Sequence, residues 1–497
     1  MSRPLSLTVK ALLLASGKLL TAISTLLATA TLTRLLPVEE YGTHRQVLLV
    51  FAMVSPVLMM GVPKALYYFL PGETTRPRGV LLDNLAVLTL GGALFGLGIA
   101  VGLGDLVADR FDNPAVSPLL WLLVPYALFF FPQQAVSACL MAVDKVRKLV
   151  LYNVASRLLL VVTVIVAAVI SPTARATVAA NALWSAVVGV PAIVLMLRAV
   201  GGAGRPTQAG MAQQLRFGIP LGLASLLGVL SLQFDKFIVS SMCSTEDFAV
   251  YVTGAMEVPL IDIVTGAITA VVIPQLTVFY KTDRLDQIVS LWQRAMNKAL
   301  LILTPVMFVV LLLGDELMTV VFSARYTDSS VPLRIYALML PLRSAVYGSV
   351  LMATDNTRYV TLSALVGLVV NVALSWLMVW LFGANGAAWA TCIAVYAVAG
   401  TLLFPMARVL KTTPRALVDW GHVGKSLLAA GLPAAPVFAL GAWLEAPDLV
   451  RLVVMGAAYG LGVIVVYRQT GLATPRQLLD FLRRRGRQAP PPDAGSP

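Results

Sequence analysis

Ionisable and hydroxyl side chains interrupt several long apolar stretches of this 497-residue sequence. Such groups are costly inside apolar surroundings, so they are candidates for binding or transport chemistry by default. In the first stretch, polar residues recur every three or four positions and share one helical face: Lys18, Thr21, Thr25, Thr29 and Thr33. We expect this face to line a water-filled cavity. Alternatively, the hydroxyls bond back to their own helix and Lys18 reaches for the membrane surface.

Other charges lie in later apolar stretches. Lys64, Arg157 and Arg343 are embedded cations, although Arg157 lies toward one end of its stretch, where it could simply reach the surface. Asp235 and Lys236 are adjacent, so they point about 100° apart on a helix and cannot form one face. We expect either of them to line a cavity or, near the end of its stretch, to be solvated.

The most deeply placed acids of the second half are Glu257 and Asp262, which flank Pro259. They are candidates for coupling to H⁺ or Na⁺, and the alternative is a hydrogen bond at a helix kink. Cations (Lys18, Lys64, Arg157) thus mark the first half and acids (Asp235, Glu257, Asp262) the second. A cationic lobe suits a diphosphate, because Lys and Arg can replace the water lost by its oxygens.

Signatures of catalysis, metal binding and nucleotide binding are weak or missing from the sequence. The segment GHVGKS at 421–426 has Asp419 where a phosphate-binding loop requires glycine. The two histidines, His44 and His422, are far apart, and the three cysteines (Cys139, Cys243 and Cys392) lie in separate apolar stretches. We therefore expect no catalytic residue, no metal and no cofactor, and an ion gradient or the membrane potential as the source of energy.

The composition predicts an all-α polytopic membrane protein. Hydrophobic residues make up 58% of the chain and charged residues 12%, far from soluble domains. Continuous apolar runs of roughly 18–25 residues can each cross about 30 Å of hydrocarbon as a helix. We predict fourteen such helices, at 11–33, 46–68, 80–103, 118–142, 149–170, 176–197, 215–240, 249–274, 297–314, 330–353, 359–382, 385–406, 426–444 and 449–467.

Charge in the loops predicts the orientation. Lys and Arg concentrate in alternate loops near 76–78, 145–148, 198–216, 281–298 and 408–425, whereas the intervening loops at 104–114, 244–248, 314–316 and 445–448 are acidic or nearly neutral. The positive-inside rule then places both termini in the cytoplasm and explains the net charge of +13 without nucleic acid. Residues 471–497 are expected to form a basic, Pro-rich cytoplasmic tail.

A repeated octet divides the chain. LMAVDKVR (140–147) and LMATDNTR (351–358) end the fourth and tenth predicted helices, and both follow a Tyr-Ala-Leu and a proline. Because six helices separate the copies, the repeats have the same orientation, as in transporters built from two parallel lobes. We predict an N-terminal six-helix lobe (1–200), a C-terminal six-helix lobe (201–415) and two additional helices (416–470).

Two stretches resemble a known family: LTRLLPVEEYG at 32–42 and LRFGIPLGLASLLGVLSLQFDKFIVS at 215–240. They are similar to polysaccharide biosynthesis proteins, the Wzx-type flippases of the multidrug/oligosaccharidyl-lipid/polysaccharide superfamily. The resemblance implies flipping of a polyprenyl-diphosphate-linked oligosaccharide to the outer leaflet of the bacterial cytoplasmic membrane. It also implies membrane lipids, H⁺ or Na⁺, and polysaccharide polymerase or chain-length machinery as partners, with no nucleic acid.

Four other functions stay open from the sequence. They are a lipid II flippase, a cation-coupled drug exporter, a membrane glycan polymerase or ligase, and a scaffold without transport. An enzyme of the polymerase class would carry a long outer loop, whereas the longest outer loop predicted here is 315–329. We therefore predict a transporter rather than an enzyme.

The cationic-lobe hypothesis predicts that Lys18→Ala slows flipping, because a diphosphate would lose one of the charges that replace its hydration. The measurement is the rate at which a lipid-linked oligosaccharide becomes accessible on the outer leaflet. An unchanged rate would contradict the hypothesis.

Overall fold

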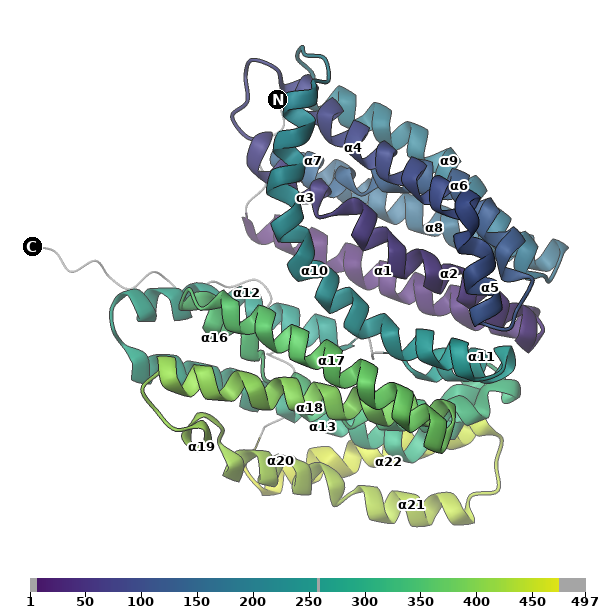
Figure 1. Ribbon diagram of the computed structural model, residues 1–497. Coiled ribbons are helices and arrows are strands. Elements are labelled where there is room, and N and C mark those ends of the chain that lie inside the picture. The colour runs from purple at the N-terminus through teal and green to yellow at the C-terminus, as the bar shows by residue number, and fades with distance from the viewer. Residues whose placement is uncertain (1–6, 257–259, 473–497) are drawn as a thin grey trace, which may run out of the picture.

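The computed structural model describes residues 7–256 and 260–472, which are almost entirely helical and contain no β-strand (Figure 1). The predicted all-α polytopic class is therefore confirmed. Glu257 and the tail lie outside the described residues. The described helices group into two bundles joined by α10 (Gln208–Met242).

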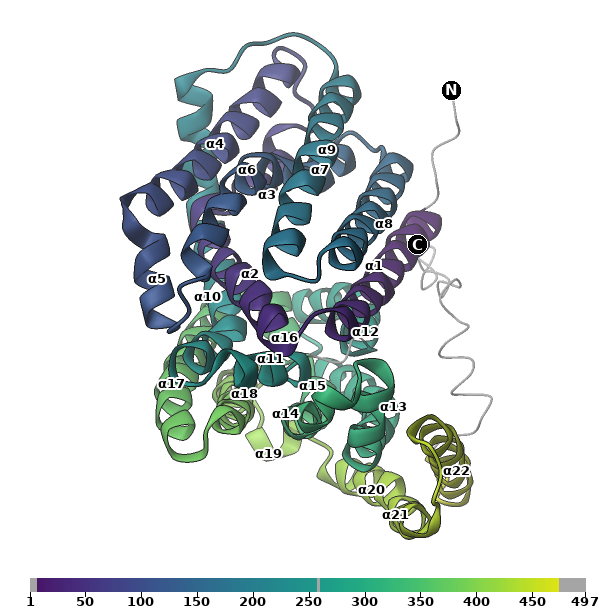
Figure 2. The same ribbon diagram turned by 90° about the vertical axis from the view of Figure 1, so that its right-hand side faces the viewer.

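The first bundle contains helices up to residue 200. They are α1 (Leu7–Leu35), α2 (Val38–Met59), α3 (Val62–Phe69), α4 (Pro77–Gly98) with a π-helical turn (Ile99–Leu103), α5 (Gly104–Arg110), α6 (Val116–Gln133), α7 (Ala135–Ala142), α8 (Val146–Ile170) and α9 (Ala174–Val200). Figure 2 shows this bundle beside the second, with α10 on one flank and α1 on the other.

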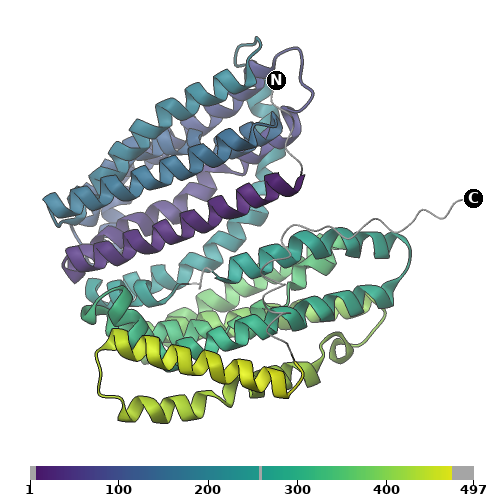
Figure 3. The same cartoon turned by 180° about the vertical axis from the view of Figure 1, so that it is seen from behind.

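The second bundle follows α10. It contains α11 (Thr245–Gly254), α12 (Leu260–Lys281), α13 (Leu285–Val321), a 3-10 turn (Ala324–Ser329), α14 (Ser330–Ala337), α15 (Leu340–Arg343), α16 (Tyr347–Ala353), α17 (Thr357–Phe382) and α18 (Ala384–Val409). The chain ends with α19 (Pro414–Leu417), α20 (Trp420–Gly431), α21 (Ala434–Trp443) and α22 (Asp448–Gln469), which lie on the side of this bundle away from the first (Figure 3).

The structure supports fewer spans than the fourteen we predicted. Eleven helical segments of the described residues are long and apolar enough to cross a membrane, or thirteen if each of two bent pairs is one span. The described apolar part of α1, Leu19–Leu35, falls short of the spanning length. The multi-pass architecture is confirmed, and the count of fourteen stays a prediction.

Two segments that we predicted as outer loops contain helix, so the predicted helix boundaries there were wrong. Asp315 and Glu316, predicted in an outer loop, lie inside α13. Asp315 pairs with Arg334 at 3.0 Å and Glu316 with Arg451 of α22 at 2.9 Å. The predicted loop at 104–114 likewise contains α5.

Some predicted spans are broken helices. The second predicted span is interrupted between α2 and α3, where Met60 and Gly61 both adopt left-handed backbone conformations. The tenth is divided into α14, α15 and α16, with a bend of 45°. In α10, the segments on either side of residues 224–225 differ in direction by 51°.

The two octets adopt the same backbone turn. Asp144 and Asp355 have φ of 55° and 58°, the left-handed conformation that often terminates a helix. The following N–H donates to a carbonyl five residues back in each copy: Lys145 to Leu140 and Asn356 to Leu351, both at 2.8 Å. This paired 6→1 bond is the Schellman motif. The octets therefore mark equivalent helix ends in the two bundles.

The bundles meet at the end that we predict to be outside the cell. Thr33 at the end of α1 donates to the carbonyl oxygen of Phe322 at 3.0 Å, and Arg34 donates to that of Val320 at 2.5 Å. Tyr41 and Tyr326 pack edge to face with ring centroids 5.8 Å apart. These contacts join the two bundles at this end.

The turn conformation makes a stability prediction. Asp355→Gly should leave the unfolding free energy within about 0.5 kcal/mol of the parent, because glycine accepts positive φ without steric cost. Asp355→Val should lower it by about 1–3 kcal/mol, since a β-branched residue is strained there. The midpoint of unfolding in detergent measures both variants. Equal midpoints would show that the turn conformation does not matter.

Candidate functional site

A guanidinium lies at the middle of a spanning helix of the first bundle. Arg157 is the twelfth residue of the 25-residue helix α8, and it donates to the hydroxyl oxygen of Thr25 on α1. Our prediction that Arg157 lies toward the end of its span, where it could reach the surface, was wrong, because the side chain crosses to the neighbouring helix. Thr25 is exposed, so this pair is accessible from outside the protein core.

The guanidinium of Arg157 lacks a compensating charge within the part of the chain that the structure describes. The ion pairs found among the described residues do not involve Arg157. In this part of the chain, the buried Nε atom of Arg157 also has no hydrogen-bond partner. A cation at this depth is costly unless an anion accompanies it. Arg157 is therefore suited to receive an anionic group.

The threonines of α1 do not all share one environment. The hydroxyls of Thr21 and Thr25 donate to carbonyls one turn back, which was the alternative that we kept open. Thr29 is half-buried, whereas Thr33 is fully buried and bonds to the second bundle. Lys18 belongs to α1, but its side chain lies outside the described part of the structure.

The other cation candidates lie at the interruptions of broken spans. Lys64 is exposed on α3, directly after the α2–α3 break. Arg343 ends the short helix α15 and is half-buried. Of the two ion-coupling candidates, Glu257 is outside the described residues, and Asp262 lies in α12 with its side chain outside them.

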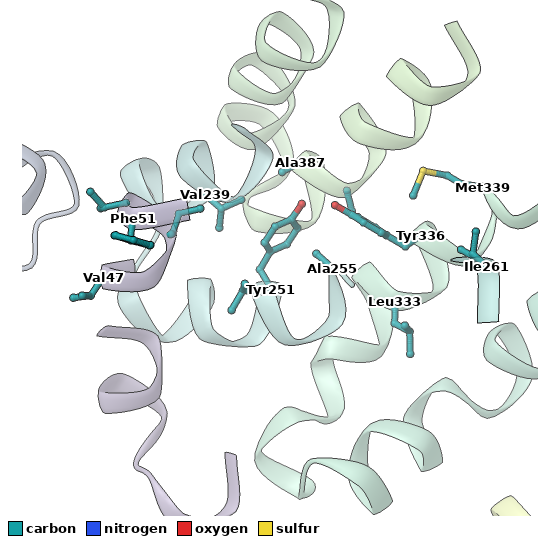
Figure 4. Packing of buried hydrophobic residues seen from close by; sticks show 14 of the residues in the cluster. Val47, Phe51, Val239, Tyr251, Ala255, Ile261, Leu333, Tyr336, Met339 and Ala387 are labelled. Atoms are coloured by element: carbon teal, nitrogen blue, oxygen red, sulfur yellow. The ribbon is translucent and has the colours of Figure 1, made fainter. Parts of the chain in front are cut away.

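Asp235 lies at the centre of a buried hydrogen-bond cluster rather than on a solvated surface. Its side chain is fully buried, and Oδ2 accepts hydrogen bonds from the hydroxyls of Tyr251 at 2.7 Å and Tyr336 at 2.5 Å. Figure 4 shows the two tyrosines with their hydroxyls turned toward each other. The carboxylate thereby joins α10 to α11 and α14. Of the two alternatives that we kept open, cavity lining and solvation near the end of the stretch, solvation is wrong for Asp235.

Lys236 completes this cluster. Its Nζ atom lies 3.4 Å from Oδ1 of Asp235 and donates to the carbonyl of Leu232 at 2.8 Å. The prediction that neighbouring side chains point apart missed this contact, because a flexible lysine can fold back along its own helix. In this conformation Lys236 is a partner of the buried acid, with a side chain 15% exposed.

The sequence reasoning overlooked the two tyrosines that hold Asp235. Tyr336 belongs to the repeated Tyr-Ala-Leu, which we used only to align the repeats. Its counterpart Tyr126 instead joins an aromatic cluster with Phe51 and Phe130. The sequence did contain a signal for this contact, because the second repeat carries both Asp235 and the retained Tyr336. Only the fold, however, shows that these two residues meet.

A second buried acid fixes the opposite end of α10. Asp83 of α4 pairs with Arg76 at 2.7 Å and accepts the backbone N–H of Thr207 at 2.6 Å. In the exposed turn before Arg76, the hydroxyl of Thr75 and then two backbone N–H groups lower the pKa of Glu73. The loop before α10 is therefore fastened to the first bundle.

The first half of α10 is held by the first bundle, whereas the second half contacts both bundles. Gln214 bonds to Asn84 and to the carbonyl of Val80 in the first half. In the second half, the carbonyl of Ser231 accepts from Asn371 of α17 at 3.1 Å. Near the end of α10, the hydroxyl of Ser240 also accepts a hydrogen bond from Gln46 of α2 at 3.0 Å, so the second half of α10 lies between the two bundles. The described residues contain no group of three or more His, Cys, Asp or Glu side chains that could hold a metal.

Comparison with known proteins identifies a family and several proteins that share the fold. A family model described as "Polysaccharide biosynthesis protein" matches residues 31–331. The probable low-salt glycan biosynthesis flippase Agl15 of Haloferax volcanii is 24% identical over 174 residues, which cover 35% of this chain and 37% of the relative. The match thus spans little more than a third of that curated protein.

Solved structures share the fold across most of the chain. The lipid II flippase MurJ in an inward closed conformation has a TM-score of 0.71 at 15% identity, covering 93% of this chain and 99% of its own. An inward-facing multidrug resistance MATE transporter of the MOP superfamily has a TM-score of 0.63 at 15% identity, covering 79% and 95%. At this identity, the likeness concerns the fold.

The Asp235 cluster predicts a large loss of stability on truncation. Asp235→Ala should lower the free energy of unfolding by about 3–5 kcal/mol, because it strands a lysine and two tyrosine hydroxyls in a buried site. Chemical unfolding in detergent measures the change. Asp109→Ala, at an exposed position of α5, is the control and should leave the midpoint unchanged. A loss no larger than the control's would show that the cluster does not hold the bundle together.

Proposed function

The chain belongs to the polysaccharide biosynthesis protein family, and we propose that it flips a lipid-linked oligosaccharide for surface polysaccharide synthesis. The substrate is a polyprenyl-diphosphate-linked repeat unit. It moves from the inner to the outer leaflet of the bacterial cytoplasmic membrane by alternating access, with both termini of the protein in the cytoplasm. This function makes the chain a transporter and not an enzyme.

The observation that carries this proposal is the guanidinium of Arg157 at the middle of α8, which forms no ion pair with the residues that the structure describes. A diphosphate crossing the membrane must exchange its water for other donors. The planar guanidinium offers several N–H groups in a geometry that matches phosphate oxygens. Thr25 directs one of them and leaves others for the substrate.

The two-bundle architecture supports alternating access. In this conformation, Thr33 and Arg34 hold the bundles together at the predicted outer end. We propose that residues 1–200 and 201–415 act as the moving lobes, with 416–470 as an addition. The substrate enters from the cytoplasmic side, the contacts of Thr33 and Arg34 break, and the lobes reopen outward.

Coupling and partners follow from the same proposal. Glu257 and Asp262 remain the candidates for H⁺ or Na⁺ coupling, and polysaccharide polymerase or chain-length machinery would use the flipped product. The buried state of Asp235 gives this acid a structural role in the closed conformation. Lipid II flipping and cation-coupled drug export are the competing functions within the superfamily.

The proposal is tested in vesicles that contain the purified protein and undecaprenyl diphosphate carrying a labelled oligosaccharide. We expect the protein to accelerate the appearance of the sugar on the opposite leaflet, where a membrane-impermeant oxidant detects it. Lipid II and a cationic dye serve as competing substrates. Transport of either one without the lipid-linked oligosaccharide would overturn the assignment.

Arg157 provides the residue-level prediction. Arg157→Gln should slow flipping at least about tenfold, because one charge-assisted contact with a phosphate contributes roughly 1.5–3 kcal/mol. Arg157→Lys should retain part of the rate, since the charge remains but the planar donor set is lost.

The matched control for Arg157 is Arg358→Gln. Arg358 is exposed near the start of α17, where its guanidinium lies 4.9 Å from the centre of the Tyr359 ring. It should leave flipping unchanged. If both arginine variants behaved alike, Arg157 would have no special role in moving the substrate.

A further inference from the structure

An exposed group of aromatic rings lies at the junction of α3 and α10. The rings of Tyr68 and Phe217 are stacked, with centroids 5.0 Å apart and planes 21° from parallel. Phe69 packs edge-on against both. Tyr68 is nevertheless 67% exposed and Phe217 is 36% exposed. The stack is thus covered on one side only.

Close backbone packing brings these rings together. At the α2–α3 break, Met60 and Gly61 lie directly against Gly218 and Gly222 of α10. A Cβ added at Gly222 would lie 2.4 Å from the carbonyl carbon of Met60, and one added at Gly218 would lie 2.9 Å from its oxygen. Two glycines four residues apart permit this approach. Phe217 is thereby placed beside the end of α3.

Helix α3 has an exposed side, which carries Lys64 and Tyr68. The opposite side of the helix is buried through Val62, Ala65 and Leu66. Its neighbours α4, α7 and α10 occupy the remaining directions within the first bundle, and Figure 2 shows α3 well inside that bundle. Tyr68 thus projects from the exposed side of α3, away from this packing.

A cation shares this face. Lys64 is exposed and precedes Tyr68 by four residues, so both side chains project from the same side of α3. An aromatic face with a cation one turn away offers two kinds of recognition. The ring packs against the apolar C–H face of a sugar, and the ammonium attracts a phosphate.

We infer that Tyr68, Phe217 and Lys64 form a platform that binds the sugar next to the diphosphate as the substrate enters from the cytoplasmic side. This inference rests on the proposed function and adds the part of the substrate that the platform contacts. Residues 62–69 form the last segment of the span before the predicted cytoplasmic loop. The platform therefore lies on the entry side of Arg157, which is at mid-span.

The experiment compares two probes in nanodiscs: bare undecaprenyl diphosphate and undecaprenyl diphosphate linked to di-N-acetylchitobiose. Tyr68→Leu should weaken binding of the glycosylated lipid about 3- to 10-fold, the range of one aromatic contact, and leave the bare lipid unaffected. Tyr68→Trp should restore binding. Lys64→Gln should weaken both probes, because both carry the diphosphate.

The control is Trp443→Leu, which removes an aromatic side chain that is 86% exposed on α21, remote from the first bundle. It should change neither affinity. Equal effects of Tyr68→Leu on the two probes, or no effect on either, would overturn the platform while the parent protein still flips the glycosylated lipid. If the parent protein neither binds nor flips that lipid, the proposed function itself fails.

Discussion

Buried charge requires a partner, and this requirement organises the molecule. Inside a membrane no water is available to stabilise an isolated charge. Asp83 and Asp235 each pair with a cation near in sequence and also accept hydrogen bonds from distant segments, Asp83 from Thr207 before α10 and Asp235 from the tyrosines of α11 and α14. Glu316 pairs directly with Arg451 of the terminal α22. Arg157 meets a neutral hydroxyl instead. Within the described part of the chain, these satisfied charges act as connections, and we propose that the guanidinium of Arg157 remains available for a substrate.

Helix α10 shows how these connections bear on movement. Asp83 fastens the segment before its first turn to the first bundle, and Asp235 fastens its second half to α11 and α14. The two segments of α10 already differ in direction by 51°. Because Gln46 of α2 also bonds to Ser240, the second half of α10 contacts both bundles, and the helix is shared between them. The same helix carries Phe217, so a change in the bend would also move one wall of the aromatic platform.

The distribution of groups along the proposed substrate path has a physical order. Lys64 and Tyr68 lie near the predicted cytoplasmic end, Arg157 at the middle of α8, and the Thr33 and Arg34 contacts at the predicted outer end. A headgroup entering from the cytoplasm would meet an aromatic surface and a cation first, then a second cation, then a closed barrier. This sequence of contacts suits an amphipathic anion whose sugar and diphosphate need different surroundings.

The sequence by itself determined the all-α class, the multi-pass character and the family, because long apolar runs and short signatures are local properties of the chain. It also located the octets, whose matching turns follow from local backbone geometry. Only the tertiary structure decided that Asp235 is enclosed by Tyr251 and Tyr336, that Arg157 reaches α1, and that Tyr68 stacks on Phe217. Periodicity gives the face of a helix on which a residue lies, but not the helix that this face meets. That choice depends on packing between segments that are far apart in the sequence, by 101 positions for Asp235 and Tyr336 and by 132 for Arg157 and Thr25.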